Sequence, residues 1–85
     1  MPTAEEIATF IVKSLEEMNL DVEDVGMETM IGPSGVDLDS LALAELVARL
    51  EDTYGVTFPE EEVEELAIMT LGEFAELVAK RAAGQ

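Results

Sequence analysis

The sequence predicts an all-α protein: a four-helix bundle of three main helices and one short helix, with a long first loop. Two capping boxes precede apolar residues at helical spacing, and another such run ends at a glycine. No stretch has the alternating pattern of a β-strand of any length. Because 85 residues are enough for one core and too few for two, we expect a single domain over residues 1–85.

The first helix is expected over residues 4–18. Thr3 and Glu6 have the spacing of a capping box, in which each side chain binds the other residue's backbone N–H. Apolar residues then recur on one face, which predicts that this face packs against the core. They are Ile7, Phe10, Ile11, Leu15 and Met18.

The segment 19–38 shows no lasting period, although it is too apolar for a solvated linker. We expect an ordered loop that helps to close the core, with a turn at residues 32–35. Its apolar residues are Leu20, Val22, Val25, Met27, Met30 and Ile31. Because methionine adapts to irregular cavities, we expect four methionines to fill gaps in the core. They are Met18, Met27, Met30 and Met69.

The remaining three helices have clear boundaries. Asp39 is a suitable N-cap for the second, which Gly55 ends, and Pro59 can open a short, glutamate-rich third. Thr70 and Glu73 form the capping box of the last. The face of the second helix that we expect to be buried carries Leu43, Leu46, Val47, Leu50 and Tyr54. The third helix carries one apolar residue, Val63, among five glutamates. The buried face expected for the last helix carries Leu71, Phe74, Ala75, Val78 and Ala82.

Charge and composition exclude several functions. Four Lys and Arg against twenty Asp and Glu give a formal net charge of −16. Nucleic-acid binding requires a basic face, so we expect basic proteins as partners instead. Cysteine and histidine are both missing, which removes thiol nucleophiles, His-activated serines and the usual zinc and haem ligands. We therefore expect a protein that is not an enzyme and holds no metal.

The first residues lack a basic segment followed by an apolar one, and no stretch is long and apolar enough to span a membrane. We expect a cytoplasmic monomer that does not bind membranes.

The second helix has one unusual feature. Its outward face combines Leu41, Glu45, Ala48 and Asp52, and a leucine at the exposed start of a helix has no evident structural role.

Ser40 begins this helix, where free backbone N–H groups favour an anion; as an alternative, it shares the capping with Asp39. The run Asp39-Ser40-Leu41-Ala42-Leu43-Ala44-Glu45-Leu46, followed by Ala48-Arg49-Leu50-Glu51 and Tyr54-Gly55-Val56, strongly resembles the acyl carrier proteins. The similarity continues through Phe58-Pro59 and Thr70-Leu71-Gly72-Glu73-Phe74, and covers roughly residues 36–80. The sequence departs from the family pattern at two positions. Asp37 stands three residues before the serine, where the family usually has glycine, and Gly35 lies two positions earlier. Ala48 is smaller than the residue that the family often has at the matching position.

The resemblance implies that Ser40 carries 4′-phosphopantetheine, derived from coenzyme A, between Asp39 and Leu41. The thiol of this arm would hold acyl groups as thioesters and carry them between enzymes. The implied partners are a phosphopantetheinyl transferase, a ketosynthase, and an acyltransferase or ligase. Docking residues implied by the resemblance and the outward charge pattern are Asp39, Leu41, Glu45, Ala48, Asp52, Glu60, Glu61, Glu62 and Val63.

The sequence is more similar to free-standing carriers of type II polyketide synthases than to fatty-acid carriers, which commonly have an acidic residue after Ser-Leu. Peptidyl carriers are less similar still. Two other classes remain as alternatives. A helical adaptor would use Ser40 only as a cap. A calcium-binding loop starting at Asp37 fits poorly, because Ala42 and Ala48 stand where such a loop requires glycine and glutamate.

Overall fold

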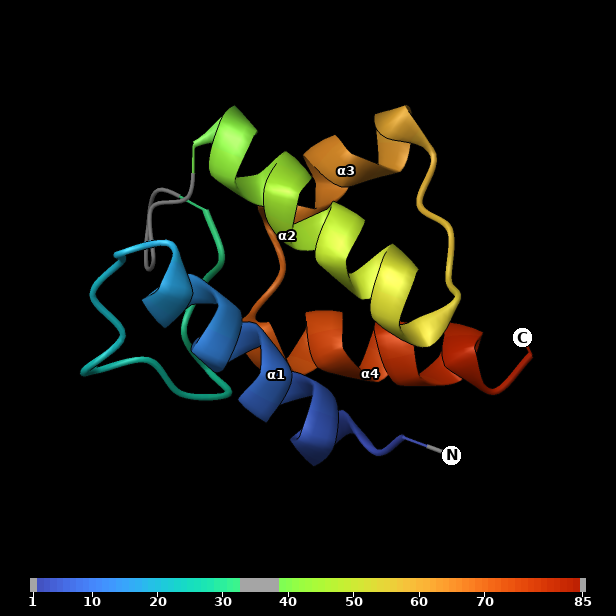
Figure 1. Cartoon of the computed structure of the whole chain (residues 1–85), viewed down its shortest axis with the longest axis horizontal. Helices are drawn as coiled ribbons and strands as arrows, with labels where there is room; N and C mark the ends of the chain where they lie inside the picture. The colour runs from blue at the N-terminus through green and yellow to red at the C-terminus, as the bar shows by residue number, and fades with distance from the viewer. Residues whose placement is uncertain (1, 33–38, 85) are drawn as a thin grey trace.

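The computed structural model describes residues 2–32 and 39–84, with Ser40 described by its backbone only. It has four α-helices in this part of the chain: α1 (Ala4–Glu17), α2 (Ser40–Tyr54), α3 (Glu60–Leu66) and α4 (Leu71–Ala82) (Figure 1). The helix pair α1 and α4 packs together, α2 crosses above this pair, and α3 lies beside α2. The predicted all-α four-helix architecture is confirmed.

Local signals in the sequence account for the helix ends. The carboxylate of Asp39 accepts a hydrogen bond from the Ala42 N–H at 2.7 Å, and Gly55 ends α2 in the left-handed conformation with φ 69°. Both halves of the capping box form at Thr70 and Glu73. At Thr3, the described residues show only the bond from the Glu6 N–H to the threonine hydroxyl.

Two helix ends differ from the prediction. The first helix stops at Glu17, one residue early, because Asn19 turns left-handed with φ 65°. The N–H groups of Asn19 and Leu20 then bond back to Glu16 and Leu15, as in a Schellman motif. Pro59 is the N-cap of α3 rather than its first helical residue.

The apolar faces predicted for the helices form the centre of the core. Ile7, Ile11 and Leu15 of α1 pack there with residues of α2, α3 and α4. The other buried apolar residues are Ala8, Ile31, Leu43, Leu46, Val47, Leu50, Val56, Phe58, Leu66, Leu71, Phe74, Ala75 and Val78. Four residues predicted on these faces, Phe10, Met18, Tyr54 and Ala82, are only partly buried at its edge.

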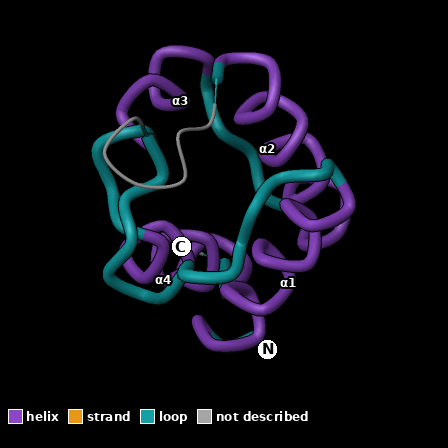
Figure 2. The backbone as a smooth tube through the Cα atoms, turned by 90° about the vertical axis from the view of Figure 1, so that its left-hand side faces the viewer, coloured by secondary structure: helices purple, strands orange, loops and turns teal. Residues whose placement is uncertain are grey.

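The first connection packs against the core as expected, at the end of the molecule that faces the viewer in Figure 2. Ile31 is fully buried. Three backbone hydrogen bonds join this connection to the segment before and at the start of α4. They run from Ile31 N to Met69 O at 3.0 Å, from Leu71 N to Thr29 O at 2.8 Å and from Gly72 N to Met27 O at 2.8 Å.

The expected packing of the methionines is wrong in part. Met27 is 42% exposed, because its carbonyl faces Gly72 while its side chain lies at the surface of the connection. Met18, Met30 and Met69 are partly buried, so none of the four lies in the fully buried core of the described residues. The departures at Gly35 and Asp37, and the turn expected after Gly32, fall outside the described residues.

Gly32 is required where the first connection meets the α3–α4 connection. A Cβ at this position would collide with the carbonyl oxygen of Ala67. We expect Gly32→Ala to lower the free energy of unfolding by about 1–3 kcal/mol, because the backbone must shift to relieve the contact. Gly26→Ala is the matched control, since a Cβ there meets open space. Thermal unfolding of the two variants checks this, and equal melting temperatures would contradict it.

Candidate functional site

Ser40 is the first residue of α2, and Asp39, not Ser40, is its N-cap. The Asp39 carboxylate accepts from Ala42, and its carbonyl accepts from the Leu43 N–H at 2.9 Å. Capping therefore does not require the Ser40 hydroxyl. The first turn of a helix of 15 residues also presents N–H groups and the positive end of the helix dipole, which stabilise a phosphate ester.

The face of α2 that follows Ser40 is exposed. Leu41 has 83% of its surface exposed, whereas Leu43 and Leu46 of the same helix are buried. Glu45, Ala48 and Asp52 are exposed as well. The helical period explains this arrangement, since the core side is already occupied by Leu43, Leu46, Val47 and Leu50. An apolar side chain and two carboxylates therefore share a face that is free to meet another protein.

One basic residue limits the negative charge of this face. The guanidinium of Arg49 lies 2.7 Å from the Glu17 carboxylate of α1 and 3.9 Å from that of Glu45. The first pair connects α1 to α2 and the second lies within α2; both are at the surface, where such ion pairs add little stability. Their main effect is that Glu45 lies beside a positive charge of its own chain.

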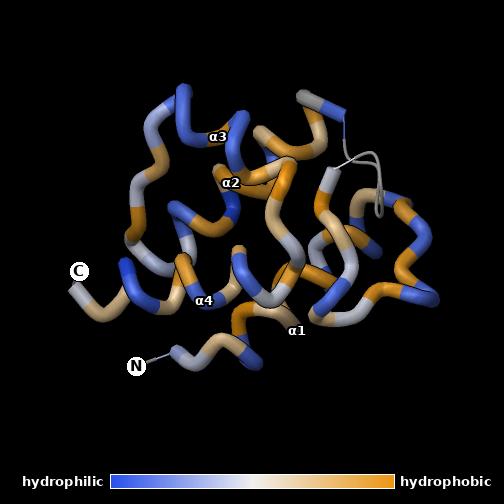
Figure 3. The backbone as a smooth tube through the Cα atoms, turned by 180° about the vertical axis from the view of Figure 1, so that it is seen from behind, coloured by the Kyte–Doolittle hydropathy of each residue, from blue (hydrophilic) through white to orange (hydrophobic). Residues whose placement is uncertain are grey.

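The short helix α3 is strongly acidic, and it stands out as a hydrophilic segment in Figure 3. Glu60 and Glu61 are exposed, and Val63 is half-buried against the core. Glu62 differs from its neighbours. Its side chain is 23% exposed, and both carboxylate oxygens accept hydrogen bonds from Arg81 of α4. The charge of Glu62 is therefore used inside the molecule, unlike those of Glu60 and Glu61.

The ion pair affects the ionisation of Glu62. Hydrogen bonds from Arg81 hold the pKa of the Glu62 carboxyl below its ordinary value. A carboxyl group whose pKa is lowered on folding contributes stability above its unfolded pKa, and this stability is lost as the pH falls through the folded pKa.

We therefore expect Glu62→Gln to lower the free energy of unfolding by about 1 kcal/mol at pH 7. The difference from the unaltered protein should begin to shrink below about pH 5, because protonation of Glu62 then starts to remove the charge that Gln lacks at every pH. Urea unfolding at several pH values measures it, with Glu60→Gln as the control for the same change at an exposed position of α3. A difference that stays constant down to pH 3 would contradict the assignment.

Comparison with known families identifies the chain. The sequence model of the family described as "Phosphopantetheine attachment site" matches residues 15–78, which include α2, α3 and most of α4. The chain belongs to this family. It is a carrier protein whose prosthetic group is 4′-phosphopantetheine, and it is not an enzyme. No solved structure matches the chain significantly.

The structure around Ser40 fits such a group. The carrier protein has a serine at the N-terminal turn of α2, where a phosphodiester would meet the free N–H groups and the helix dipole. The neighbouring carboxylate of Asp39 is engaged by the Ala42 N–H, so part of its negative charge is already compensated. The exposed Leu41 leaves this turn open on its outer side.

The calcium-binding alternative is wrong. A loop starting at Asp37 would have to continue through residues 40–48, which are helical. Within residues 2–32 and 39–84, no group of three acidic side chains is placed to hold a metal.

In that same part of the carrier protein, no helix is long and apolar enough to cross a membrane.

Two residues of interest were missed by sequence reasoning. Ile68 is 74% exposed just after α3, although it stands in the apolar run 66–69 and therefore looks like a core residue. The sequence alone places Arg81 in the last turn of a helix, where a cation complements the helix dipole. No sequence signal identifies its pairing with Glu62, because nineteen positions separate the two residues.

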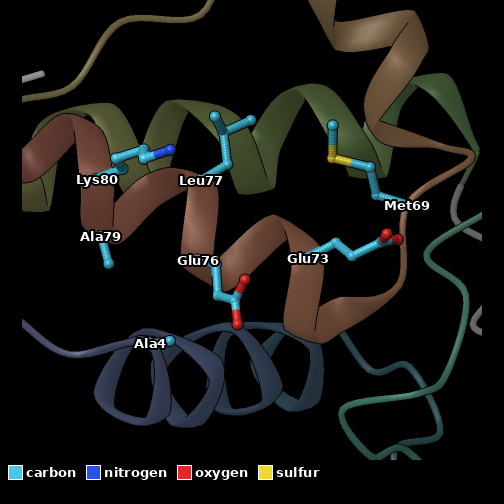
Figure 4. Close-up of a pocket in the computed structure, with 7 residues that line it drawn as sticks. All are labelled: Ala4, Met69, Glu73, Glu76, Leu77, Ala79 and Lys80. Carbon is cyan, nitrogen blue, oxygen red and sulfur yellow. The ribbon is translucent and has the colours of Figure 1, made fainter.

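A shallow depression along α4 contains none of the predicted site residues (Figure 4). Its polar groups are the carboxylates of Glu73 and Glu76 and the ammonium of Lys80, and Glu73 is already used in the capping box. Met69 and Leu77 supply apolar surface. We assign no function to this depression.

Proposed function

We propose that Ser40 is the attachment point of 4′-phosphopantetheine and that the protein is a free-standing acyl carrier of a type II polyketide synthase. The observation that carries the attachment site is the position of Ser40 as the first residue of α2, inside the matched segment. The polyketide assignment is supported by similarity to such carriers of the run from Ser40 to Glu45 and of the segments at residues 48–51 and 54–56.

Loading requires an enzyme, because the chain has no histidine to act as the base for a serine hydroxyl. A phosphopantetheinyl transferase would supply the metal and the base that removes the proton from the Ser40 hydroxyl. The serine oxygen would bond to the phosphorus on the pantetheine side of the coenzyme A pyrophosphate. The phosphorus–oxygen bond to the nucleotide would break, and adenosine 3′,5′-bisphosphate would leave.

The prosthetic group, when bound, provides the thiol that holds acyl groups as thioesters. The residues of this chain have a different role, which is to present that thiol to successive enzymes. A tethered acyl group reaches each enzyme at high effective concentration. The exposed face of α2, together with Glu60 and Glu61 of α3, offers negative charge and one apolar contact to enzymes with basic docking surfaces. Such rim charges accelerate association more than they prolong binding, which suits a transient carrier.

The experiment has two stages. The purified chain is incubated with coenzyme A, magnesium and a broad-specificity transferase, and its intact mass should rise by one phosphopantetheine group. The same incubation with malonyl-coenzyme A in place of coenzyme A gives the malonyl-loaded protein, which is then offered to ketosynthases of type II polyketide and fatty-acid systems. We expect a higher kcat/KM with the polyketide enzyme. The reverse preference would favour a fatty-acid carrier, and failure of the first stage would favour an unmodified adaptor.

A further inference from the structure

Arg81, in the last turn of α4, contacts several groups around the start of α3. Its guanidinium donates to the carbonyl of Thr57 at 2.9 Å and to both carboxylate oxygens of Glu62. It also lies over the ring of Phe58, 4.8 Å from the centroid. In Figure 1 the connection between α2 and α3 begins next to this end of α4. One side chain of α4 thus holds the connection and the first turn of α3 together.

The same connection is attached to α2 and to the core. The Phe58 N–H donates to the Glu51 carboxylate at 2.9 Å. The Phe58 ring is buried and meets the ring of Phe74 edge-on, with 6.0 Å between the centroids. The start of α3 is therefore held from two sides, by Glu51 of α2 and by Arg81 of α4.

Helix α3 depends on these contacts. It has only seven residues, five of which are glutamates, and helices of this length are not stable by themselves. Among the described residues, no side chain caps its N-terminus. The neighbouring carboxylates also repel one another. Arg81 lowers that repulsion, because it places a positive charge against Glu62 in the first turn.

We propose that Arg81 is a positioning residue that holds α3 in the orientation in which Glu60 and Glu61 meet partner enzymes. This inference rests on the proposed function, since it concerns how a carrier is recognised. Glu62 and Arg81 neutralise each other internally, while Glu60 and Glu61 remain exposed on the same short helix. The glutamates of α3 therefore have two roles: Glu62 anchors the helix, and Glu60 and Glu61 bind partners.

The first test measures the local stability of α3. Arg81→Met removes the guanidinium but keeps an apolar chain over Phe58, and Lys80→Met makes the same charge change at the adjacent, exposed position. We expect amide hydrogen exchange of residues 60–66 to become about tenfold faster in Arg81→Met and to stay unchanged in Lys80→Met. Arg81→Lys keeps the charge but not the forked hydrogen bonds, so its exchange rate in residues 60–66 should lie between those of Arg81→Met and Lys80→Met. Equal exchange in Arg81→Met and Lys80→Met would overturn the proposal.

The second test measures recognition by the transferase. Arg81→Met should raise the KM for the carrier about threefold at unchanged kcat. The reason is that displacing the exposed carboxylates of Glu60 and Glu61 mainly slows association with the transferase. In a Glu60→Gln, Glu61→Gln background, Arg81→Met should add almost nothing to KM, although hydrogen exchange still rises. An unchanged KM, or an equal increase in both backgrounds, would overturn the positioning role. If no variant is loaded at all, the proposed function fails, while hydrogen exchange still decides whether Arg81 holds α3.

Discussion

Replacing Ser40 by alanine should abolish the gain of phosphopantetheine completely while leaving the fold intact. The loss should be complete because the reaction forms a bond to the serine oxygen, for which alanine has no substitute. The fold should remain because Asp39 and not Ser40 caps α2, through its bond to the Ala42 N–H. We expect a change in the free energy of unfolding within about 0.5 kcal/mol.

Intact-protein mass spectrometry after incubation with coenzyme A and a transferase is the measurement, combined with thermal unfolding of the same samples. Thr53→Ala is the matched control, since it removes an exposed hydroxyl from the other end of α2. This variant should gain one phosphopantetheine group as the unaltered chain does. A Ser40→Ala protein that still gains this mass would place the attachment at another residue.

Two leucines of α2 should respond in opposite ways to the same substitution. Leu46 is fully buried and Leu41 is 83% exposed. Leu46→Ala should cost about 3 kcal/mol of stability, because it removes buried methyl groups and leaves a cavity. This is a large part of the roughly 4–13 kcal/mol expected for a chain of this size. Leu41→Ala should change stability by less than about 0.5 kcal/mol.

The effects of the two substitutions on kcat/KM should have the reverse order, with Leu41→Ala causing the larger loss. We expect Leu41→Ala to lower kcat/KM for the transferase and the ketosynthase about tenfold, because an apolar docking contact is lost. Leu46→Ala should be loaded normally under conditions in which it is folded. Urea unfolding and steady-state kinetics of both variants make the comparison. A Leu41→Ala protein with full kcat/KM would remove Leu41 from the docking surface.

Several features of the carrier could be predicted from short stretches of sequence. A cap and the groups it bonds lie three or four positions apart, so Asp39, Gly55 and the Thr70–Glu73 pair determine helix ends by local hydrogen bonding. The helical period assigns residues to faces in the same way. It correctly placed Leu43 inside and Leu41 outside, with the exposed row that follows on α2.

Other features depend on contacts between distant segments. Whether Phe10 and Tyr54 lie inside or at the edge of the core depends on their packing on each other, with 5.4 Å between the ring centroids. Met27 and Ile68 are apolar and yet exposed, because backbone pairing of residues 27–31 with 69–72 determines which side chains of these connections face the core. Residue type alone does not specify that pairing.

The glutamates of α3 show the same distinction at the site. The sequence by itself determined that the chain is acidic, helical and equipped with a serine at the start of α2, because charge, period and capping act within a few residues. It treated Glu60, Glu61 and Glu62 alike. Only the tertiary structure decided that Glu62 faces Arg81, since an ion pair between two helices exists only after the fold has brought the helices together.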